Sequence, residues 1–130
     1  MSLLKVQNLK KYFSVPGGTL HAVDDVTFSI EKGTTLGVVG ESGCGKSTLG
    51  KTIMKLHQPT SGKILFDGVD IAPMKPREFK KYRYGIQMIF QDPYATLDGR
   101  MDVAELIAEP LIVSKMYKDK NQIRKRVDEL

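Results

Sequence analysis

The stretch VVGESGCGKSTLGKTIMKL, Val38 to Leu56, decides what this chain folds into and what it binds. Two valines lead into a glycine-rich run with a lysine and two hydroxyl residues, and a helical pattern follows at once. Gly40, Gly45, Lys46 and Ser47 complete the pattern G-x-x-x-x-G-K-[ST]. This pattern predicts a loop between a strand and a helix that holds the phosphates of a nucleotide.

Each residue type in the loop has a physical task. An anion must lie against bare backbone N–H groups, so glycine is needed wherever a Cβ would stand in the way. The N–H groups of about Gly43 to Thr48 are expected to form a concave anion site, with the positive end of the next helix behind it. Lys46 adds a full charge for the β- and γ-phosphates, Ser47 a hydroxyl for Mg²⁺, and Thr48 a hydroxyl for the α-phosphate. The predicted phosphate-binding residues are Ser42, Gly43, Cys44, Gly45, Lys46, Ser47 and Thr48, with Cys44 a small residue at a variable position. A glycine-rich surface turn that binds nothing is the alternative, which the strand before and the helix after the loop disfavour.

Composition narrows the class of protein. The chain has 130 residues, of which 41% are hydrophobic and 27% charged, as in a globular domain or part of one. No apolar run approaches the roughly 18 residues of a membrane helix, and lysines stand where a signal peptide needs an apolar stretch. We therefore expect neither a signal peptide nor a transmembrane segment. The net charge of +5 comes from dispersed basic residues without an aromatic–basic motif, so we expect no nucleic-acid partner.

Hydrophobic periodicity predicts the elements around the loop. Residues 3–12 and 22–30 form two antiparallel strands, the second half-buried with Val26, Phe28 and Ile30 on one face. The apolar run 34–39 is typical of a buried parallel strand, and Pro59 is expected to end the helix after the loop. Further along we expect strands at 63–67 and 86–90, a short helix at 77–82, a helix from Asp102 that Pro110 interrupts or ends, and a final helix with Ile123, Val127 and Leu130 on one stripe.

Two longer stretches resemble the nucleotide-binding subunits of ABC transporters. They are HAVDDVTFSIEKGTTLGVVGESGCGKSTLGKTIMKLHQPTSGKILFDGVDI and IQMIFQDPYATLD. The combination of ESGCGKSTLG with FQDPYATLD resembles in particular the second ATPase subunit of oligopeptide and dipeptide importers. The resemblance runs from Leu4 to about Leu111. It implies an α/β fold: a P-loop NTPase core with an antiparallel β subdomain and the start of an α-helical subdomain.

The resemblance also assigns residues and cofactors. Residues 1–130 would be the N-terminal portion of one nucleotide-binding domain, with the β subdomain and P-loop core at 3–90 and the Q-loop and start of the helical subdomain at 91–130. Tyr12 matches the aromatic residue that stacks on adenine, with Phe13 as the fallback. Gln91 matches the glutamine that reaches Mg²⁺ and the attacking water. The cofactors implied are ATP and Mg²⁺, with Lys46 and Gln91 as catalytic residues and Ser47 and Gln91 as magnesium ligands.

The sequence departs from the family pattern beyond these motifs. It has no LSGGQ-like signature run, no apolar strand ending in Asp-Glu and no switch histidine. We interpret the final Val-Asp-Glu-Leu as part of a helix, because basic residues precede it in a helical pattern. The resemblance therefore implies a truncated subunit that binds nucleotide weakly, hydrolyses it little alone and is marginally stable.

The function expected is that of an ATP-binding subunit, or a fragment of one, of a peptide importer at the cytoplasmic face of the membrane. The partners implied are a second ABC ATPase subunit, the transmembrane permease subunits and, indirectly, an extracytoplasmic substrate-binding protein. Two alternatives stay open: a nucleotide-binding fragment without transport activity, and a soluble ABC ATPase. Turnover that a Lys46→Ala change abolishes separates the importer subunit from the inactive fragment, and copurification with a permease separates it from the soluble protein.

Overall fold

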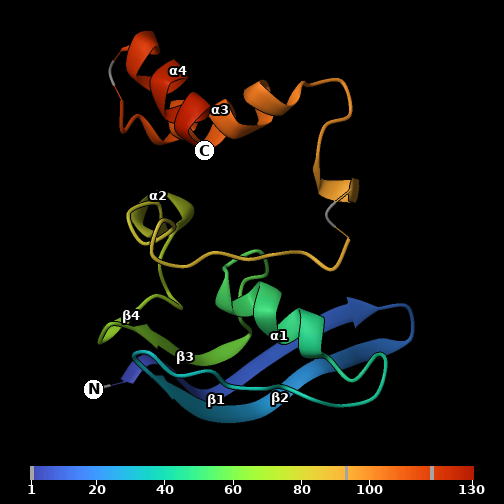
Figure 1. Cartoon of the computed structure of the whole chain (residues 1–130). Helices are drawn as coiled ribbons and strands as arrows, with labels where there is room; N and C mark the ends of the chain where they lie inside the picture. The colour runs from blue at the N-terminus through green and yellow to red at the C-terminus, as the bar shows by residue number, and fades with distance from the viewer. Residues whose placement is uncertain (1, 93, 118) are drawn as a thin grey trace. The chain divides into compact units, whose positions relative to one another are not determined.

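The computed structural model describes residues 2–92, 94–117 and 119–130. The chain divides into two compact units, one ending at Met88 and one from Ile89 to Leu130 (Figure 1). The first unit carries a four-stranded antiparallel sheet in the order β2-β1-β3-β4, formed by β1 (Ser2–Val15), β2 (Gly18–Glu31), β3 (Ser61–Phe66) and β4 (Val69–Asp70). Helix α1 (Lys46–Ile53) lies over one face of this sheet, and the short helix α2 (Pro76–Phe79) follows β4 (Figure 1).

The long hairpin of β1 and β2 confirms the two antiparallel strands expected from the alternating pattern. Pro16 and Gly17 form the turn, where Gly17 has a φ of 88°. Irregular pairing bends the hairpin, and Asn8 and Asp25 take left-handed φ angles of 46° and 54°. Asn8 Nδ2 donates to Asp25 Oδ1 over 2.9 Å across the strands, which fixes this bend in place.

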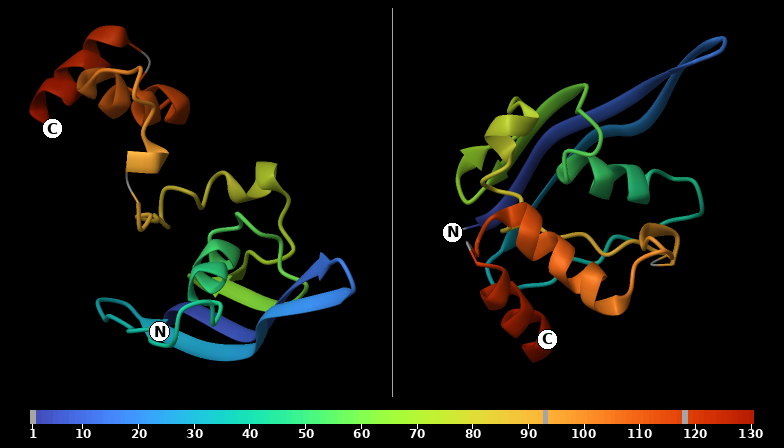
Figure 2. Two further views of the ribbon diagram at one scale, coloured as in Figure 1. Left: turned by 90° about the vertical axis from the view of Figure 1, so that its right-hand side faces the viewer. Right: turned by 90° about the horizontal axis from the view of Figure 1, so that it is seen from above.

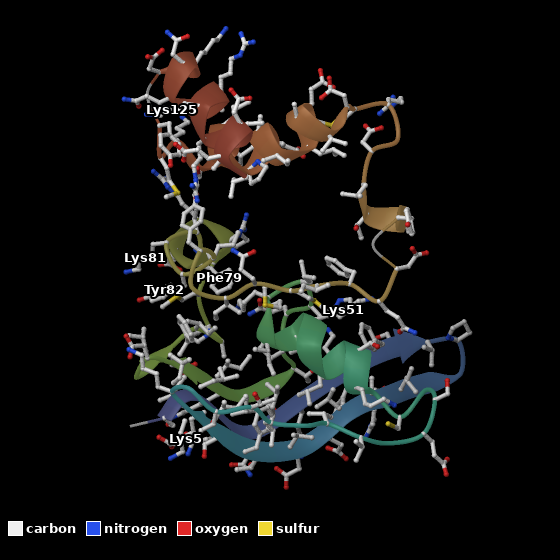
Figure 3. All side chains as sticks on the ribbon, in the orientation of Figure 1. Lys5, Lys51, Phe79, Lys81, Tyr82 and Lys125 are labelled. Carbon is white, nitrogen blue, oxygen red and sulfur yellow. The ribbon has the colours of Figure 1, made fainter. Side chains whose placement is uncertain are left out.

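The core of the first unit lies between the sheet and α1. Its buried apolar residues are Val6, Leu9, Val23, Leu49, Ile64, Ile71, Ala72 and Phe79 (Phe79 is labelled in Figure 3). Leu49 anchors α1, and Thr52 of the same helix is buried with its hydroxyl bonded to Thr48 O over 2.7 Å. Burial of one such apolar side chain stabilises a fold by about 1.5–3 kcal/mol. The loop that precedes α1 is thereby held against the sheet.

Three expectations for residues 34–90 were wrong. Residues 34–39 form no strand and are exposed throughout, with Val39 92% exposed. Residues 86–90 form no strand either. A strand needs a hydrogen-bonded neighbour, and no strand of the described residues pairs with these two runs. Helix α1 ends at Ile53 rather than near Pro59, since Lys55 takes a φ of 60°, and Leu56 is consequently exposed.

The second unit is helical. It contains the 3-10 turn η1 (Tyr94–Thr96), helix α3 (Val103–Ser114) and helix α4 (Lys120–Glu129), and α3 contacts α4 (Figure 2). The expected start of α3 is confirmed, because Asp102 Oδ1 accepts from Glu105 N over 2.8 Å and Glu105 Oε2 accepts from Asp102 N over 3.0 Å. None of the described helices combines the length and the apolar character needed to cross a membrane.

The expectation that Pro110 would interrupt or end α3 was also wrong. Pro110 neither interrupts nor ends the helix, which continues to Ser114 and stops at Lys115, where φ is 56°. In α4, Ile123 and Val127 are half-buried as expected, whereas Leu130 lies beyond the helix and is exposed.

Candidate functional site

The glycine-rich loop, the start of α1 and the far end of the β1–β2 hairpin enclose one cavity of about 320 Å³. All of its lining belongs to the first unit. The hairpin contributes Phe13, Leu20, His21 and Ala22, and the loop and helix contribute Gly43, Cys44, Gly45, Lys46, Ser47 and Thr48. The hairpin therefore gives the cavity an aromatic and apolar side. The loop and the start of α1 give it a polar side, which consists of backbone groups, the Lys46 ammonium and two hydroxyl groups.

Two glycines give the loop its shape. Gly45 has a φ of 96°, and a Cβ there would lie 2.0 Å from the carbonyl oxygen of Ala22. Gly43 has a φ of 81° with open space around it, so only the backbone conformation selects glycine there. The loop can thus approach β2 closely and turn into α1 without a side chain over its N–H groups.

The start of α1 presents unpaired backbone donors to the cavity. The first helical hydrogen bond runs from Leu49 N to Gly45 O over 2.8 Å. The N–H groups before Leu49 consequently have no partner within the helix. The first turn of α1 has no acidic residue and its last turn carries Lys51, so no side-chain charge of the first turn opposes the positive end of the helix. This end of α1 suits a phosphate.

Lys46 is held inside the loop by its own backbone. Its Nζ donates to Gly40 O over 2.8 Å and to Glu41 O over 2.6 Å, and lies 3.4 Å from Cys44 Sγ. An ammonium group has three donors, and all three have a partner here; the contact with Cys44 Sγ is the longest and weakest, so it is the one that an anion would replace. A preorganised cation at this position loses little freedom when an anion binds.

The predicted loop residues do not all line the cavity. Gly43, Cys44, Gly45, Lys46, Ser47 and Thr48 do, whereas Ser42 is exposed in the same loop outside the lining. The magnesium ligand expected at Ser47 is an exposed hydroxyl in the first turn of α1. Among the described residues, no group of three or more His, Cys, Asp and Glu side chains is arranged to hold a metal ion.

The aromatic residue of the cavity is Phe13, the fallback, and not Tyr12. Neighbouring residues of a strand point to opposite faces, and Tyr12 turns its ring to His21, with ring centroids 3.8 Å apart and an interplanar angle of 10°. Its hydroxyl donates to Asp24 Oδ1 over 2.5 Å. Phe13 lines the cavity, with Lys11 Nζ 4.6 Å from its ring centroid. Phe13 is thus among the residues that line the cavity and Tyr12 is not, and the adenine-stacking role expected of Tyr12 stays a prediction.

A small charged cluster stands beside the cavity. Asp24 lies 3.6 Å from Lys10 Nζ and 3.7 Å from His21 Nδ1. The hydrogen bond from Tyr12 lowers the pKa of Asp24 and raises the pKa of Tyr12. Tyr12, followed by Asp24, also raises the pKa of Lys10. His21 pairs with Tyr12 across the hairpin and is among the residues that line the cavity.

Gln91 belongs to the second unit, where it is exposed shortly before η1. It is not among the residues that line the cavity. Asp92 beside it accepts from Tyr94 N over 3.1 Å and Ala95 N over 3.3 Å, which shapes the turn that follows. The catalytic and metal-binding role of Gln91 stays a prediction.

The chain is similar to known proteins along nearly its whole length. A family model described as ABC transporter matches residues 23–130. The oligopeptide transport ATP-binding protein OppF of Bacillus subtilis (strain 168) is 50% identical over 129 residues, which cover 98% of this chain and 42% of the relative. Its AppF counterpart in the same organism is 43% identical over 139 residues, covering 99% of this chain and 41% of the relative. The chain thus spans less than half the length of these relatives.

Solved structures share the fold. The post-hydrolysis dimer of the ATP-binding cassette MJ0796, bound to ADP and Pi, matches with a TM-score of 0.82 and 27% identity, over 97% of this chain and 54% of that one. The cbiO1 structure from Clostridium perfringens, part of the transporter complex cbiONQ, matches with a TM-score of 0.74 and 32% identity, over 98% and 48% of the two chains. Both likenesses extend over nearly the whole chain described here.

Proposed function

Because the chain belongs to the ABC transporter family, we propose that its cavity binds Mg-ATP and that it serves as part of the ATPase subunit of a peptide importer. One observation carries the nucleotide site: the start of α1, the Lys46 ammonium and the aromatic Phe13 meet in a single cavity. Phosphates need the first two groups, and a nucleobase suits the third.

The phosphate side works by charge and backbone geometry. The N–H groups at the start of α1 would face the β- and γ-phosphates together with the Lys46 ammonium, which exchanges its contact with Cys44 Sγ for a phosphate oxygen. The helix dipole favours their negative charge. Thr48 offers its hydroxyl to the α-phosphate. Ser47 is the residue of the loop that would hold Mg²⁺, together with phosphate oxygens and water, which is the usual arrangement for this ion. If Mg²⁺ were held there, it would supply positive charge that stabilises the negative charge of the phosphates.

The base side works by stacking. Phe13 offers a ring face to adenine, and base–aromatic stacking contributes about 1–3 kcal/mol. Lys11 lies over the Phe13 ring and so covers part of it. We therefore propose Phe13, the fallback, for the stacking role that the resemblance assigns to Tyr12.

Hydrolysis and transport extend this proposal to the whole subunit. The resemblance assigns to Gln91 the role of the glutamine that reaches Mg²⁺ and the attacking water, and a side-chain amide has the donor and acceptor groups for that role. The neighbour MJ0796 is described as a dimer bound to ADP and Pi, and OppF as an oligopeptide transport protein. We propose by analogy a second ATPase subunit and membrane permease subunits as partners, with the protein peripheral at the cytoplasmic face and an extracytoplasmic binding protein upstream of the permease.

Calorimetry on the chain tests the nucleotide site. The original chain should bind Mg-ATP and Mg-ADP, and Lys46→Ala should weaken Mg-ATP binding by at least about tenfold, since it removes a charge-assisted contact. Lys51→Ala is the matched control, because Lys51 lies on the same helix but outside the cavity lining. Folded original chain that takes up neither Mg-ATP nor Mg-ADP contradicts the proposal.

A further inference from the structure

We propose that residues 75–83, which we name the basic segment, bind the surface of an anionic lipid bilayer. The inference goes beyond the nucleotide site, because no residue of the segment lines the cavity. It adds a direct contact with lipid to the proposed peripheral placement of the protein, and this contact needs no permease.

The basic segment concentrates positive charge that is dispersed elsewhere in the chain. Five of its nine residues are basic and one, Glu78, is acidic. The five are all exposed, and they are Lys75, Arg77, Lys80, Lys81 and Arg83. In the described part of the chain, no aspartate or glutamate forms an ion pair with any of them. Glu78 Oε2 instead accepts from the backbone N–H of Lys75 over 2.7 Å, so the one acid of the segment leaves its cations unneutralised.

Aromatic side chains anchor the basic segment on the first unit. Phe79 is only 2% exposed in the core, and Tyr82 packs against the same core. Backbone hydrogen bonds close two successive turns, from Phe79 N to Lys75 O over 3.0 Å and from Tyr82 N to Phe79 O over 2.9 Å. The cations therefore extend from a backbone that is held against the sheet, and Lys81 lies beside Tyr82 on its outer side (Figure 3).

The chemistry of the segment favours a lipid surface over a nucleic acid. Single-stranded nucleic acids are held by cations together with aromatic rings on which successive bases stack. Here Tyr82 is half-buried with Lys81 Nζ 4.9 Å from its ring centroid, and only Tyr84, just after the segment, is 50% exposed. A bilayer needs dense positive charge at its headgroups, and a tyrosine suits the boundary between headgroups and acyl chains. Each Lys or Arg near such a surface strengthens association by about fivefold.

Sedimentation with lipid vesicles tests the proposal on the full chain in the absence of nucleotide. The original chain should bind vesicles of phosphatidylglycerol mixed with phosphatidylcholine and should not bind vesicles of phosphatidylcholine alone. The triple variant Lys80→Gln, Lys81→Gln, Arg83→Gln should bind the mixed vesicles at least about tenfold more weakly. Added salt should weaken binding by the original chain, because it screens exposed charges.

Two control variants separate the position of the charges from their number. The triple variant Lys5→Gln, Lys32→Gln, Lys63→Gln removes the same charge from exposed lysines elsewhere in the first unit, and it should bind almost as tightly as the original chain. The double variant Lys80→Arg, Lys81→Arg keeps the charge of the basic segment and should retain binding. All of these changes are at exposed side chains, and circular dichroism confirms that each variant is folded.

The other outcomes overturn the proposal. Failure of the original chain to bind mixed vesicles, or equal binding to both kinds of vesicle, does so directly. Equal weakening by the two triple variants means that net charge alone drives association. If the original chain binds a single-stranded oligonucleotide instead of mixed vesicles, and the basic-segment variant loses that binding, the segment is a nucleic-acid site.

Calorimetry with Mg-ATP keeps this inference apart from the proposed function. The basic-segment variant should bind Mg-ATP as the original chain does, because its changed residues lie outside the cavity lining. Vesicle binding that fails while Mg-ATP binding persists overturns the lipid contact and leaves the nucleotide site standing.

Discussion

A Cβ on Gly45 would lie 2.0 Å from the carbonyl oxygen of Ala22. The backbone of the glycine-rich loop therefore packs directly against the backbone of β2 at these two residues. Ala22 follows His21 on that strand, and both line the cavity with Gly45. The hairpin thereby fixes the loop against the residues that we propose face the base. The phosphate side and the base side of the cavity are parts of one packed structure.

Replacement of Gly45 by alanine should damage both stability and binding. The new methyl group meets a carbonyl that cannot move freely, and the φ of 96° is itself strained for any other residue. We expect a loss of about 2 kcal/mol or more in the free energy of unfolding, measured by urea denaturation, and no detectable Mg-ATP binding. Gly37→Ala is the control, because a Cβ at Gly37 meets nothing within 4 Å. An alanine variant at 45 that unfolds and binds like the original chain contradicts the role of this contact.

Truncation of Phe13 should weaken the binding of the base. Phe13→Ala removes the aromatic face of the cavity, so ATP affinity should fall by about tenfold. Phe13→Tyr should retain it. Val15→Ala, an exposed change on the same strand, serves as the control. Calorimetry decides the point, and unaltered ATP binding by Phe13→Ala rules out Phe13 as the stacking residue.

The hydrogen bond between Tyr12 and Asp24 should be visible as a pH effect. It lowers the pKa of Asp24 below its ordinary value of 3.8. A group whose pKa is lower in the folded state stabilises the fold above its unfolded pKa, and this contribution is lost as the pH falls through the folded value. Tyr12→Phe should raise the pKa of Asp24 and reduce the loss of stability on acidification below about pH 4. Carboxyl NMR titration measures the shift, and Asp98, whose pKa is lowered by Arg100, is the internal reference that should not change.

The sequence predicted correctly those elements whose formation depends on residues close together in the chain. The β1–β2 hairpin followed from alternation and a Pro-Gly-Gly turn, and the start of α3 from the spacing of Asp102 and Glu105. The runs 34–39 and 86–90 look like strands because they are apolar. However, a strand forms only with a hydrogen-bonded neighbour, and apolar composition says nothing about where that neighbour is.

The choice between Tyr12 and Phe13 shows a second limit of sequence reasoning. The pairing of β1 with β2 shifts between Lys11 and Tyr12. A bulge changes which side chains face the cavity, and strict alternation along a strand cannot reveal it.

Proline inside α3 offers a way to stabilise the second unit. Pro110 has no N–H for the helical hydrogen bond, and proline in a helix interior is about 3 kcal/mol less favourable than alanine. Pro110→Ala should therefore increase helicity in circular dichroism and slow amide exchange in α3, with a gain of about 1–3 kcal/mol for this helix. Glu109→Ala is the matched control at an exposed neighbour. If Pro110→Ala leaves exchange unchanged, the surrounding chain tolerates the missing bond at no cost.

Alkylation of Cys44 should compete with nucleotide. This is the single cysteine of the sequence, it is exposed, and it lines the cavity with its Sγ 3.4 Å from Lys46 Nζ. An acetamide group on this sulfur would occupy the space in front of the loop and displace the lysine that holds the phosphates. We expect iodoacetamide treatment to abolish Mg-ATP binding, and bound Mg-ATP to slow the modification, followed by mass spectrometry. Cys44→Ser should bind nucleotide and ignore the reagent, which separates an effect at this residue from general damage. Alkylated chain that binds Mg-ATP as tightly as untreated chain shows that the phosphates do not lie against this loop.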